Sequence, residues 1–481
     1  MNLKIIFRVL GFLLFVEGIA MGIALLVALI YGEHDTGAFL ISGGINLAIG
    51  GLIVAATSKA KKDIGKREGF IIVSMVWIVF SFFGSLPYVI SGSIPSFTDA
   101  FFETISGFTT TGSSILNDIE ALPHGILFWR SITQWLGGMG IIVLSLAILP
   151  VFGIGGMQLF MAEVPGPTPD KISPRIKQTA KTLWVIYLAF TVAETLLLWV
   201  GGMTFFDSIC HSFTTMATGG FSTKQASIAH WPSPFIQYVI IVFMFLAGTN
   251  FTLSYFAIKG KFSVAFKDEE FKYYSFFTLG FTALIFIGLL ISSEIGVEKA
   301  FRDSLFQVIT IITTTGYATA DYLMWPPVLT MLIFLLFFFG GSAGSTGGGI
   351  KIMRIVVLLK NGYYELKRLV HPNAVIPVRF NKHSVDAKIV TNVLAFFMIY
   401  FVIFAISTVI FTLIEPDMES SMGAVATCLG NIGPGLGSVG PAENFYHISP
   451  IGKWFLSFLM LLGRLELFTV LVLFSPSFWK E

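Results

Sequence analysis

Long runs of apolar residues alternate along the chain with short polar stretches. A helix needs about 20 mostly apolar residues to cross the hydrocarbon core of a bilayer. Ten runs reach that length and predict ten membrane-spanning helices. They cover residues 9–30, 37–57, 70–90, 125–150, 181–201, 235–258, 273–292, 328–360, 389–414 and 452–475.

Four further apolar segments are too short to cross a membrane, and each ends at a polar run that contains glycine. The segments cover residues 97–110, 204–217, 298–313 and 418–429, and the polar runs cover residues 109–112, 218–220, 313–316 and 431–433. Thirteen residues before the last glycine of each run stand Asp99, Asp207, Asp303 and Ser420. We interpret these as caps of re-entrant half-helices.

This spacing predicts one structural unit used four times: a span, a half-helix, a polar turn and a second span. A unit of this kind suits a pore in which backbone carbonyls hold an ion. The predicted repeats occupy residues 70–160, 161–260, 261–370 and 371–481. Residues 1–69 supply two extra, peripheral N-terminal spans.

Composition agrees with an all-α polytopic membrane protein. Hydrophobic residues make up 55% of the 481 and charged residues only 12%, about half the share of a soluble domain. Mean hydropathy is +0.82. The buried ionisable residues form no recognisable acid/base or metal cluster, so we do not expect an enzyme, a cofactor or a nucleic-acid partner.

The placement of basic residues predicts the topology. With both termini cytoplasmic, most Lys and Arg fall in cytoplasmic loops, as the positive-inside rule requires. Each repeat crosses the membrane twice, so all four repeats share one orientation. They are then related by an axis along the membrane normal, around which one chain forms a central pore.

The polar runs have the chemistry of a filter for monovalent cations. Each half-helix directs its carbonyl end, which carries a partial negative charge, toward the axis, and glycine can turn successive carbonyls inward. The predicted ion-binding residues are Thr110, Thr111, Gly112, Thr218, Gly219, Gly220, Thr314, Thr315, Gly316, Asn431, Ile432 and Gly433. The alternative is that each Thr-Gly pair simply ends a buried helix.

The sequence resembles the Trk/Ktr/HKT superfamily of potassium transporters, most closely its TrkH type, over essentially the whole chain. The motifs are Phe108-Thr109-Thr110-Thr111-Gly112, His211-Ser212-Phe213 through Ala217-Thr218-Gly219-Gly220-Phe221-Ser222, Ile312-Thr313-Thr314-Thr315-Gly316-Tyr317 and Gly430-Asn431-Ile432-Gly433-Pro434-Gly435. The resemblance implies potassium uptake across a bacterial cytoplasmic membrane, a homodimer and a cytoplasmic TrkA-type nucleotide-binding regulator. Some sodium-preferring relatives carry serine in the first loop, where this chain has Gly112. Sodium or weakly selective cation passage remains the alternative.

A glycine-rich stretch, residues 340–349, interrupts the eighth apolar segment near mid-membrane. Irregular backbone at that depth must be covered by protein or line a water-filled cavity, so we expect it below the filter; the alternative is a packing kink. The resemblance implies a loop that obstructs the pore. The predicted gate residues are Gly344, Ser345, Thr346, Gly347, Gly348, Gly349 and Arg464.

Arg464 lies within the last apolar segment, where a charge is costly unless its surroundings are polar. We expect it to face the pore beneath the filter and hold the gate loop. A structural pair with Glu466 or Glu194 is the alternative.

Other polar residues are given supporting roles. Glu103, His211, Gln307 and Ala424 share one register in the half-helices and should brace the filter from behind, with His211 a strut rather than a metal ligand. Lys351, Arg354 and the basic segment 360–388 are interpreted as a solvated cytoplasmic face, or as a site for anionic lipid or a partner protein.

Overall fold

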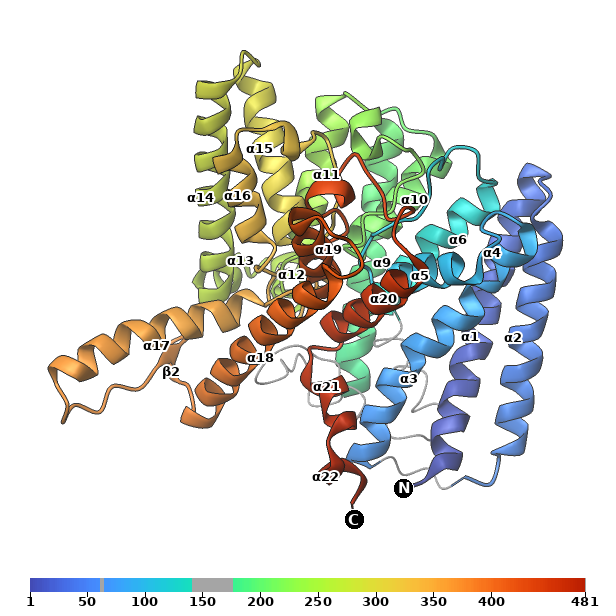
Figure 1. Cartoon of the computed structure of the whole chain (residues 1–481), viewed down its shortest axis with the longest axis horizontal. Coiled ribbons are helices and arrows are strands. Elements are labelled where there is room, and N and C mark those ends of the chain that lie inside the picture. The colour runs from blue at the N-terminus through green and yellow to red at the C-terminus, as the bar shows by residue number, and fades with distance from the viewer. Residues whose placement is uncertain (61–64, 141–175, 481) are drawn as a thin grey trace.

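The computed structural model describes residues 1–60, 65–140 and 176–480, and these are mostly helical (Figure 1). Strand in these residues is limited to the antiparallel hairpin of β1 (Arg379–Phe380) and β2 (His383–Ser384). The α-helices are α1 (Leu3–Tyr31), α2 (Thr36–Ala56), α3 (Lys66–Gly84), α4 (Leu86–Ser91), α5 (Phe97–Phe108), α6 (His124–Trp135), α9 (Ile176–Val200), α10 (Phe205–Met216), α11 (Pro234–Ala247), α12 (Phe251–Ile258), α13 (Phe262–Lys267), α14 (Glu269–Ser292), α15 (Val297–Ile312), α16 (Pro327–Leu336), α17 (Ile352–Val370), α18 (Ala387–Phe411), α19 (Met418–Gly430), α20 (Pro450–Arg464), α21 (Phe468–Leu471) and α22 (Pro476–Trp479). A π-helical turn, η1 (Leu136–Gly140), follows α6, and the 3-10 turns are η2 (Ser227–His230), η3 (Tyr322–Met324), η4 (Gly437–Val439) and η5 (Val472–Phe474).

Several of these helices are long and apolar enough to cross a membrane. Within the described residues there are six, and up to eight if each of two sharply bent helix pairs counts as one span. The six are α1, α2, the stretch Arg67–Ser91, the part Ala180–Val200 of α9, α14 and α18. The chain is a multi-pass membrane protein, as the hydropathy pattern predicts.

The predicted spans are broken in three places. The segments 235–258 and 452–475 each bend by 110°, between α11 and α12 and between α20 and the helical stretch after it. The segment 328–360 is not one helix, because α16 ends at Leu336 and α17 begins only at Ile352. The predicted segment 125–150 continues through α6 and η1, and its remainder lies outside the described residues. Hydropathy counts apolar residues and does not register where helical hydrogen bonding stops.

Local chemistry explains the breaks. The Asn250 side chain accepts a hydrogen bond from the Thr252 N–H at 2.8 Å and so starts α12 as a new helix. Just after α20, Glu466 and Leu467 have positive φ angles of 55° and 54°, so the helix cannot continue through them. Between α16 and α17 the glycine-rich residues make helix unfavourable by roughly 1 kcal/mol each.

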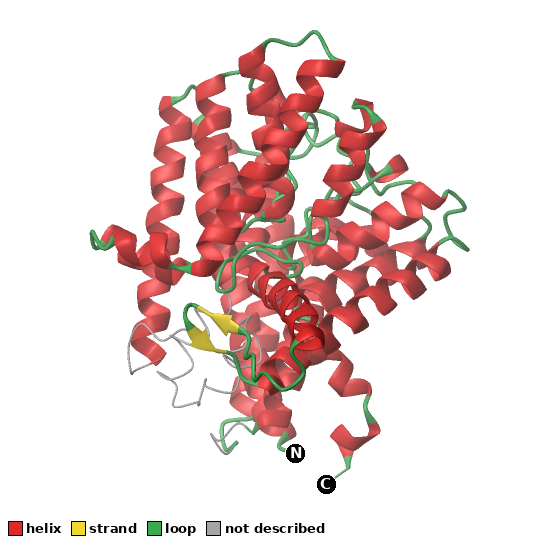
Figure 2. Cartoon of the chain, turned by 90° about the vertical axis from the view of Figure 1, so that its left-hand side faces the viewer, coloured by secondary structure: helices red, strands yellow, loops and turns green. Residues whose placement is uncertain are grey.

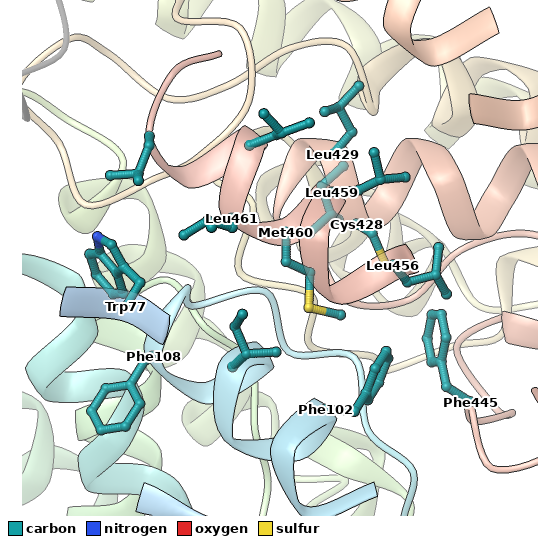
Figure 3. Packing of buried hydrophobic residues seen from close by; sticks show 14 of the residues in the cluster. Trp77, Phe102, Phe108, Cys428, Leu429, Phe445, Leu456, Leu459, Met460 and Leu461 are labelled. Carbon is teal, nitrogen blue, oxygen red and sulfur yellow. The ribbon is translucent and has the colours of Figure 1, made fainter. Parts of the chain in front are cut away.

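The helices close into a ring in sequence order. α6 packs against α10, α11 against α15, α17 against α18, and α20 returns to pack against α5. Figure 3 shows the core at this last seam, where Phe102 of α5 lies near Met460 and Leu456 of α20, and Phe108 of α5 lies on the side of Trp77 of α3. The seam therefore joins the last quarter of the chain to the first.

The ends of the chain lie at one end of the molecule (Figure 1). The Arg67 guanidinium, at the start of α3, donates a hydrogen bond to the Lys480 carbonyl at 2.6 Å. The β1–β2 hairpin lies in the same lower half of the molecule as both termini (Figure 2). The predicted placement of both termini on one side of the membrane is consistent with this arrangement.

Candidate functional site

The helices α5, α10, α15 and α19 end in the same way. The second residue before each final glycine has a left-handed backbone: Thr110 (φ 54°), Thr218 (54°), Thr314 (59°) and Asn431 (54°). The N–H that follows bonds to the carbonyl five residues back: Thr111 to Ser106 (2.9 Å), Gly219 to Thr214 (2.8 Å), Thr315 to Thr310 (2.8 Å) and Ile432 to Thr427 (3.0 Å). This is the Schellman ending, with a β-carbon-bearing residue where glycine is usual. The alternative that these runs end helices is thus correct as a description of local structure.

The four glycines that follow also share a geometry that helix ending alone does not require. All have positive φ: Gly112 (86°), Gly220 (75°), Gly316 (82°) and Gly433 (109°). Each lies against the carbonyl of a neighbouring run. A β-carbon added to Gly112 would overlap the Gly219 carbonyl oxygen, one added to Gly220 would overlap that of Thr315, and one added to Gly316 would overlap that of Ile432. A β-carbon added to Gly433 would lie 2.9 Å from the Thr111 carbonyl oxygen. These contacts run first to second, second to third, third to fourth and fourth to first, so the runs form a closed ring.

One open pocket joins the four glycines. Gly112, Gly220, Gly316 and Gly433 all line it. Arg130, Lys224 and Glu443 line the same pocket, so charged groups of both signs surround the approach to the ring.

Side chains behind the ring form hydrogen bonds to the loop segments that follow the polar runs. Glu103 accepts hydrogen bonds from the Ile115 N–H at 2.9 Å and from the Ser114 hydroxyl at 3.0 Å. The Gln307 amide donates to the Ala320 carbonyl at 3.0 Å. The predicted register of bracing residues is therefore found in the first three helices, whereas Ala424 has no polar group with which to do the same.

His211 is a strut, as predicted. Its Nδ1 bonds to the Asp207 carbonyl at 2.7 Å, which requires a proton on Nδ1, and its Nε2 lies 2.9 Å from the Ser222 hydroxyl. Among the described residues no group of three or more His, Cys, Asp or Glu is arranged to hold a metal ion.

The predicted caps are wrong by one turn. Ser96, Thr204 and Asp417 cap α5, α10 and α19 by accepting from the N–H three residues later, and α15 begins at Val297, well before Asp303. Asp99, Asp207 and Ser420 are the residues whose N–H groups are capped. The two acids still lie in the first turn, where negative charge is favourable. Hydrogen bonds from Ser420 lower the pKa of the capping Asp417 below its ordinary value.

Two basic residues that form buried ion pairs were not singled out from the sequence. Arg130 is 2% exposed, pairs with Glu103 at 2.6 Å, and donates to the Ser222 carbonyl at 2.9 Å, which ties the first run to the second. Lys453 is 4% exposed and pairs with Asp99 at 2.6 Å. The available signal was a single basic residue in an otherwise apolar stretch, which hydropathy alone does not distinguish from an exposed end.

The glycine-rich residues 340–349 lie against the helix ends that carry the ring. The Gly348 N–H donates to the Thr314 hydroxyl at 2.7 Å, and the Thr346 hydroxyl donates to the Met216 carbonyl at 2.9 Å. Glu270 of α14 accepts from the Ala343 N–H at 2.7 Å and from the Met353 N–H at 3.1 Å. Hydrogen bonds therefore hold the loop both where it meets the half-helix ends and where it meets α14.

Arg464, the last residue of α20, reaches the same place. One guanidinium nitrogen donates to the Thr110 hydroxyl at 3.0 Å and to the Thr346 carbonyl at 2.9 Å. The other donates to the carbonyls of Gly137 and Gly138 at 2.7 and 2.8 Å. Arg464 thus joins the loop to the first polar run. Glu466, offered above as a possible partner of Arg464, is paired with Arg354 instead.

Lys351 and Arg354 are not on a solvated face, which corrects the prediction for both. Lys351 is 3% exposed, and its ammonium donates to the Gly347 carbonyl of the loop. Arg354 pairs with Glu466 and lies over the Phe396 ring, 4.1 Å from its centre. Lys351 therefore contacts the loop, and Arg354 contacts the break after α20.

Comparison with known proteins settles the family. The chain matches the family described as TrkH: Cation transport protein over residues 36–481. The chain belongs to the TrkH family. It is 44% identical to the Trk system potassium uptake protein TrkH of Escherichia coli K12 and 34% identical to TrkG of the same strain, and the alignments cover at least 99% of each chain. The crystal structure of the potassium transporter TrkH from Vibrio parahaemolyticus matches with a TM-score of 0.90 and 40% identity over both whole chains. This is a family of transporters rather than enzymes.

The ring predicts a sharp penalty for a β-carbon at its glycines. In Gly316→Ala the new methyl overlaps the Ile432 carbonyl, and left-handed φ costs about 1–2 kcal/mol even without overlap. We expect cation flux into liposomes to fall more than about 10-fold by this reasoning. Gly280→Ala is the control, because nothing lies within 4 Å of its added carbon. Equal flux in the two variants would contradict the ring.

The buried pair behind the ring predicts a stability effect. Arg130→Met leaves the Glu103 carboxylate buried without its cation, which should cost about 3–5 kcal/mol. Lys224→Met removes a longer, partly exposed contact to Glu120 and should cost less than about 1 kcal/mol. Thermal unfolding in detergent compares the two. A similar loss of stability in both would show that Arg130 is not a structural partner of Glu103.

Proposed function

We propose that this TrkH-family member carries potassium through the ring of carbonyls made by residues 110–112, 218–220, 314–316 and 431–433. The observation that carries the proposal is the closed sequence of contacts from each glycine to the carbonyl of the next run. Four helix C-terminal ends meet there, and each supplies about half a negative charge. Weak, multiple carbonyl contacts favour a monovalent cation while allowing it to leave.

Potassium is favoured over sodium by two lines of support. The relatives from Escherichia coli are named potassium uptake proteins, and all four runs of this chain carry glycine at the ring position. On this proposal the repeats 70–160, 161–260, 261–370 and 371–481 are the four quarters of one pore, and residues 1–69 form peripheral spans. The boundary at residue 160 lies outside the described residues.

We further propose that Gly344, Ser345, Thr346, Gly347, Gly348, Gly349 and Arg464 form a gate on the cytoplasmic side of the ring. The loop's backbone packs against the ends of two half-helices, where it occupies the way out of the filter. The positive charge of Arg464 beneath the filter opposes a cation in transit. Its hydrogen bonds to Thr346 and Thr110 hold the loop in that position.

The cellular setting is part of the same proposal. The protein resides in the bacterial cytoplasmic membrane with both termini in the cytoplasm, acts as a homodimer, and is regulated by a cytoplasmic TrkA-type nucleotide-binding subunit. Support comes from the relatives, which are named as proteins of the Trk system. The ions are substrate, and the proposed transport needs no cofactor within this chain.

The first test is cation flux into liposomes that contain the purified chain. We expect potassium and rubidium to pass more readily than sodium and lithium, and Gly112→Ser to weaken that preference, because serine adds a β-carbon where the Gly219 carbonyl lies. Gly280→Ala serves as the folded control. Equal passage of all four ions in the unmodified protein would overturn the potassium assignment.

The gate predicts a gain of flux on removal of the loop. Deletion of residues 344–348 removes the obstruction and should raise basal potassium flux. Arg464→Ala should also raise basal potassium flux. The loss of one charge-assisted hydrogen bond destabilises the closed position of the loop by about 1.5–3 kcal/mol. Unchanged or lower flux in protein with normal size-exclusion behaviour would count against the gate.

A further inference from the structure

The side chains of the four left-handed residues have different partners. Thr314 accepts from the Gly348 N–H at 2.7 Å, and Thr110 accepts from Arg464 at 3.0 Å. Thr218 donates to the Ala217 carbonyl within its own run at 2.6 Å. The Asn431 amide donates to the Thr111 hydroxyl and to the Met460 carbonyl, both at 2.9 Å. Two of the four thus bond to the loop or to the arginine that holds it.

These two residues lie in opposite quarters of the ring, because the contacts place the first run opposite the third. Their runs also share a second feature. The hydroxyls of Thr109 and Thr111 lie 2.8 Å apart, and so do those of Thr313 and Thr315. The other two runs have Ala217 and Gly430 at the first of these positions. The two left-handed threonines that bond to the loop or to Arg464 therefore belong to the two runs that are built alike.

The loop packs closely against the ends of the third and fourth half-helices. A β-carbon at Gly347 would lie 2.9 Å from the Thr313 carbonyl, and one at Gly348 would lie 2.7 Å from the Gly430 carbonyl. Thr314 itself is fully buried. If the loop withdraws, the Thr314 hydroxyl loses the hydrogen bond from the Gly348 N–H, and the turn loses a contact that fixes its position.

We propose that the Thr314 and Thr110 hydroxyls are positioning groups that couple the loop to the filter, so that the ion preference of the filter depends on the position of the loop. The inference rests on the proposed function and adds to it. With the loop in place, two opposite turns are held from below, and their carbonyls keep the spacing that favours potassium. With the loop displaced, the third turn loses its hydrogen bond from Gly348, and the Arg464 guanidinium that bonds the first turn loses its acceptor at Thr346. The filter then distinguishes potassium from sodium less well.

The test compares Thr314→Val, Thr314→Ser, the deletion of residues 344–348, and the deletion combined with Thr314→Val. Valine keeps the β-branch and so leaves the backbone preference of the residue nearly unchanged. Serine keeps the hydroxyl. Thr282→Val is the matched control, because that buried hydroxyl bonds to Thr278 within its own helix. Thr110→Val, run in parallel, tests the opposite turn if one variant does not fold.

Two quantities are measured: the ratio of potassium to sodium flux in liposomes, and the potassium affinity of the detergent-purified chain by calorimetry. We expect Thr314→Val to raise basal flux and to lower the ion ratio by about 5-fold, the factor expected from one lost hydrogen bond. Thr314→Ser keeps the hydroxyl and should lose less of the ion ratio than Thr314→Val does, whereas Thr282→Val should resemble the unmodified protein. In the deletion background Thr314→Val should have no further effect, because its partner is already gone.

The outcomes separate this inference from the proposed function. If the deletion raises flux while the ion ratio stays at its unmodified value, the gate stands and the coupling is wrong. If Thr314→Val lowers the ratio equally in the deletion background, Thr314 acts on the ion directly and the coupling is also wrong. If the deletion leaves flux unchanged, the gate itself fails.

Discussion

The contact of each ring glycine with the carbonyl of the next run is the constraint on which the rest of the structure depends. A β-carbon at Gly112, Gly220 or Gly316 would overlap that oxygen, so the approach is possible only for glycine in a left-handed backbone. Four such contacts fix the position of four helix ends. The buried pair of Arg130 and Glu103, the His211 strut and the capped N-termini of the half-helices then serve to hold those ends in register.

A single chain can vary each quarter of such a ring, which an assembly of identical subunits cannot. Asn431 stands where the other runs have threonine, and its amide reaches across the seam to Thr111. Arg464 and the glycine-rich loop are each present once, yet together they touch several quarters. The pseudo-symmetric framework therefore supplies the ring, while departures from symmetry supply the groups that hold the loop.

The shared ending of the four half-helices was predictable from the sequence because its signal lies in spacing. A helix of nearly constant length ends at a glycine whose position the ring fixes, so residues such as Asp99 and Asp207 recur at a set distance. The caps themselves were misplaced by three residues, since Ser96 and Thr204 are ordinary polar residues until their bonds are seen. The breaks after α11 and α20 were missed because apolar residues continue through them. Lys351 was assigned to solvent, since its burial depends on the loop folding back over it.

The meeting of the two chain ends has a consequence for how such a protein can be rearranged. Arg67 binds the carbonyl of Lys480, and the Asn2 N–H donates a hydrogen bond to the Glu68 carboxylate at 2.8 Å, so both ends lie against the start of α3. Chain ends that lie close together tolerate being joined and reopened elsewhere. The exposed residues 371–375, between α17 and β1, offer a surface site for new ends. The four quarters can thus be translated in a different order from the one in which they lie around the ring. We expect a circularly permuted chain to form the same ring of carbonyls.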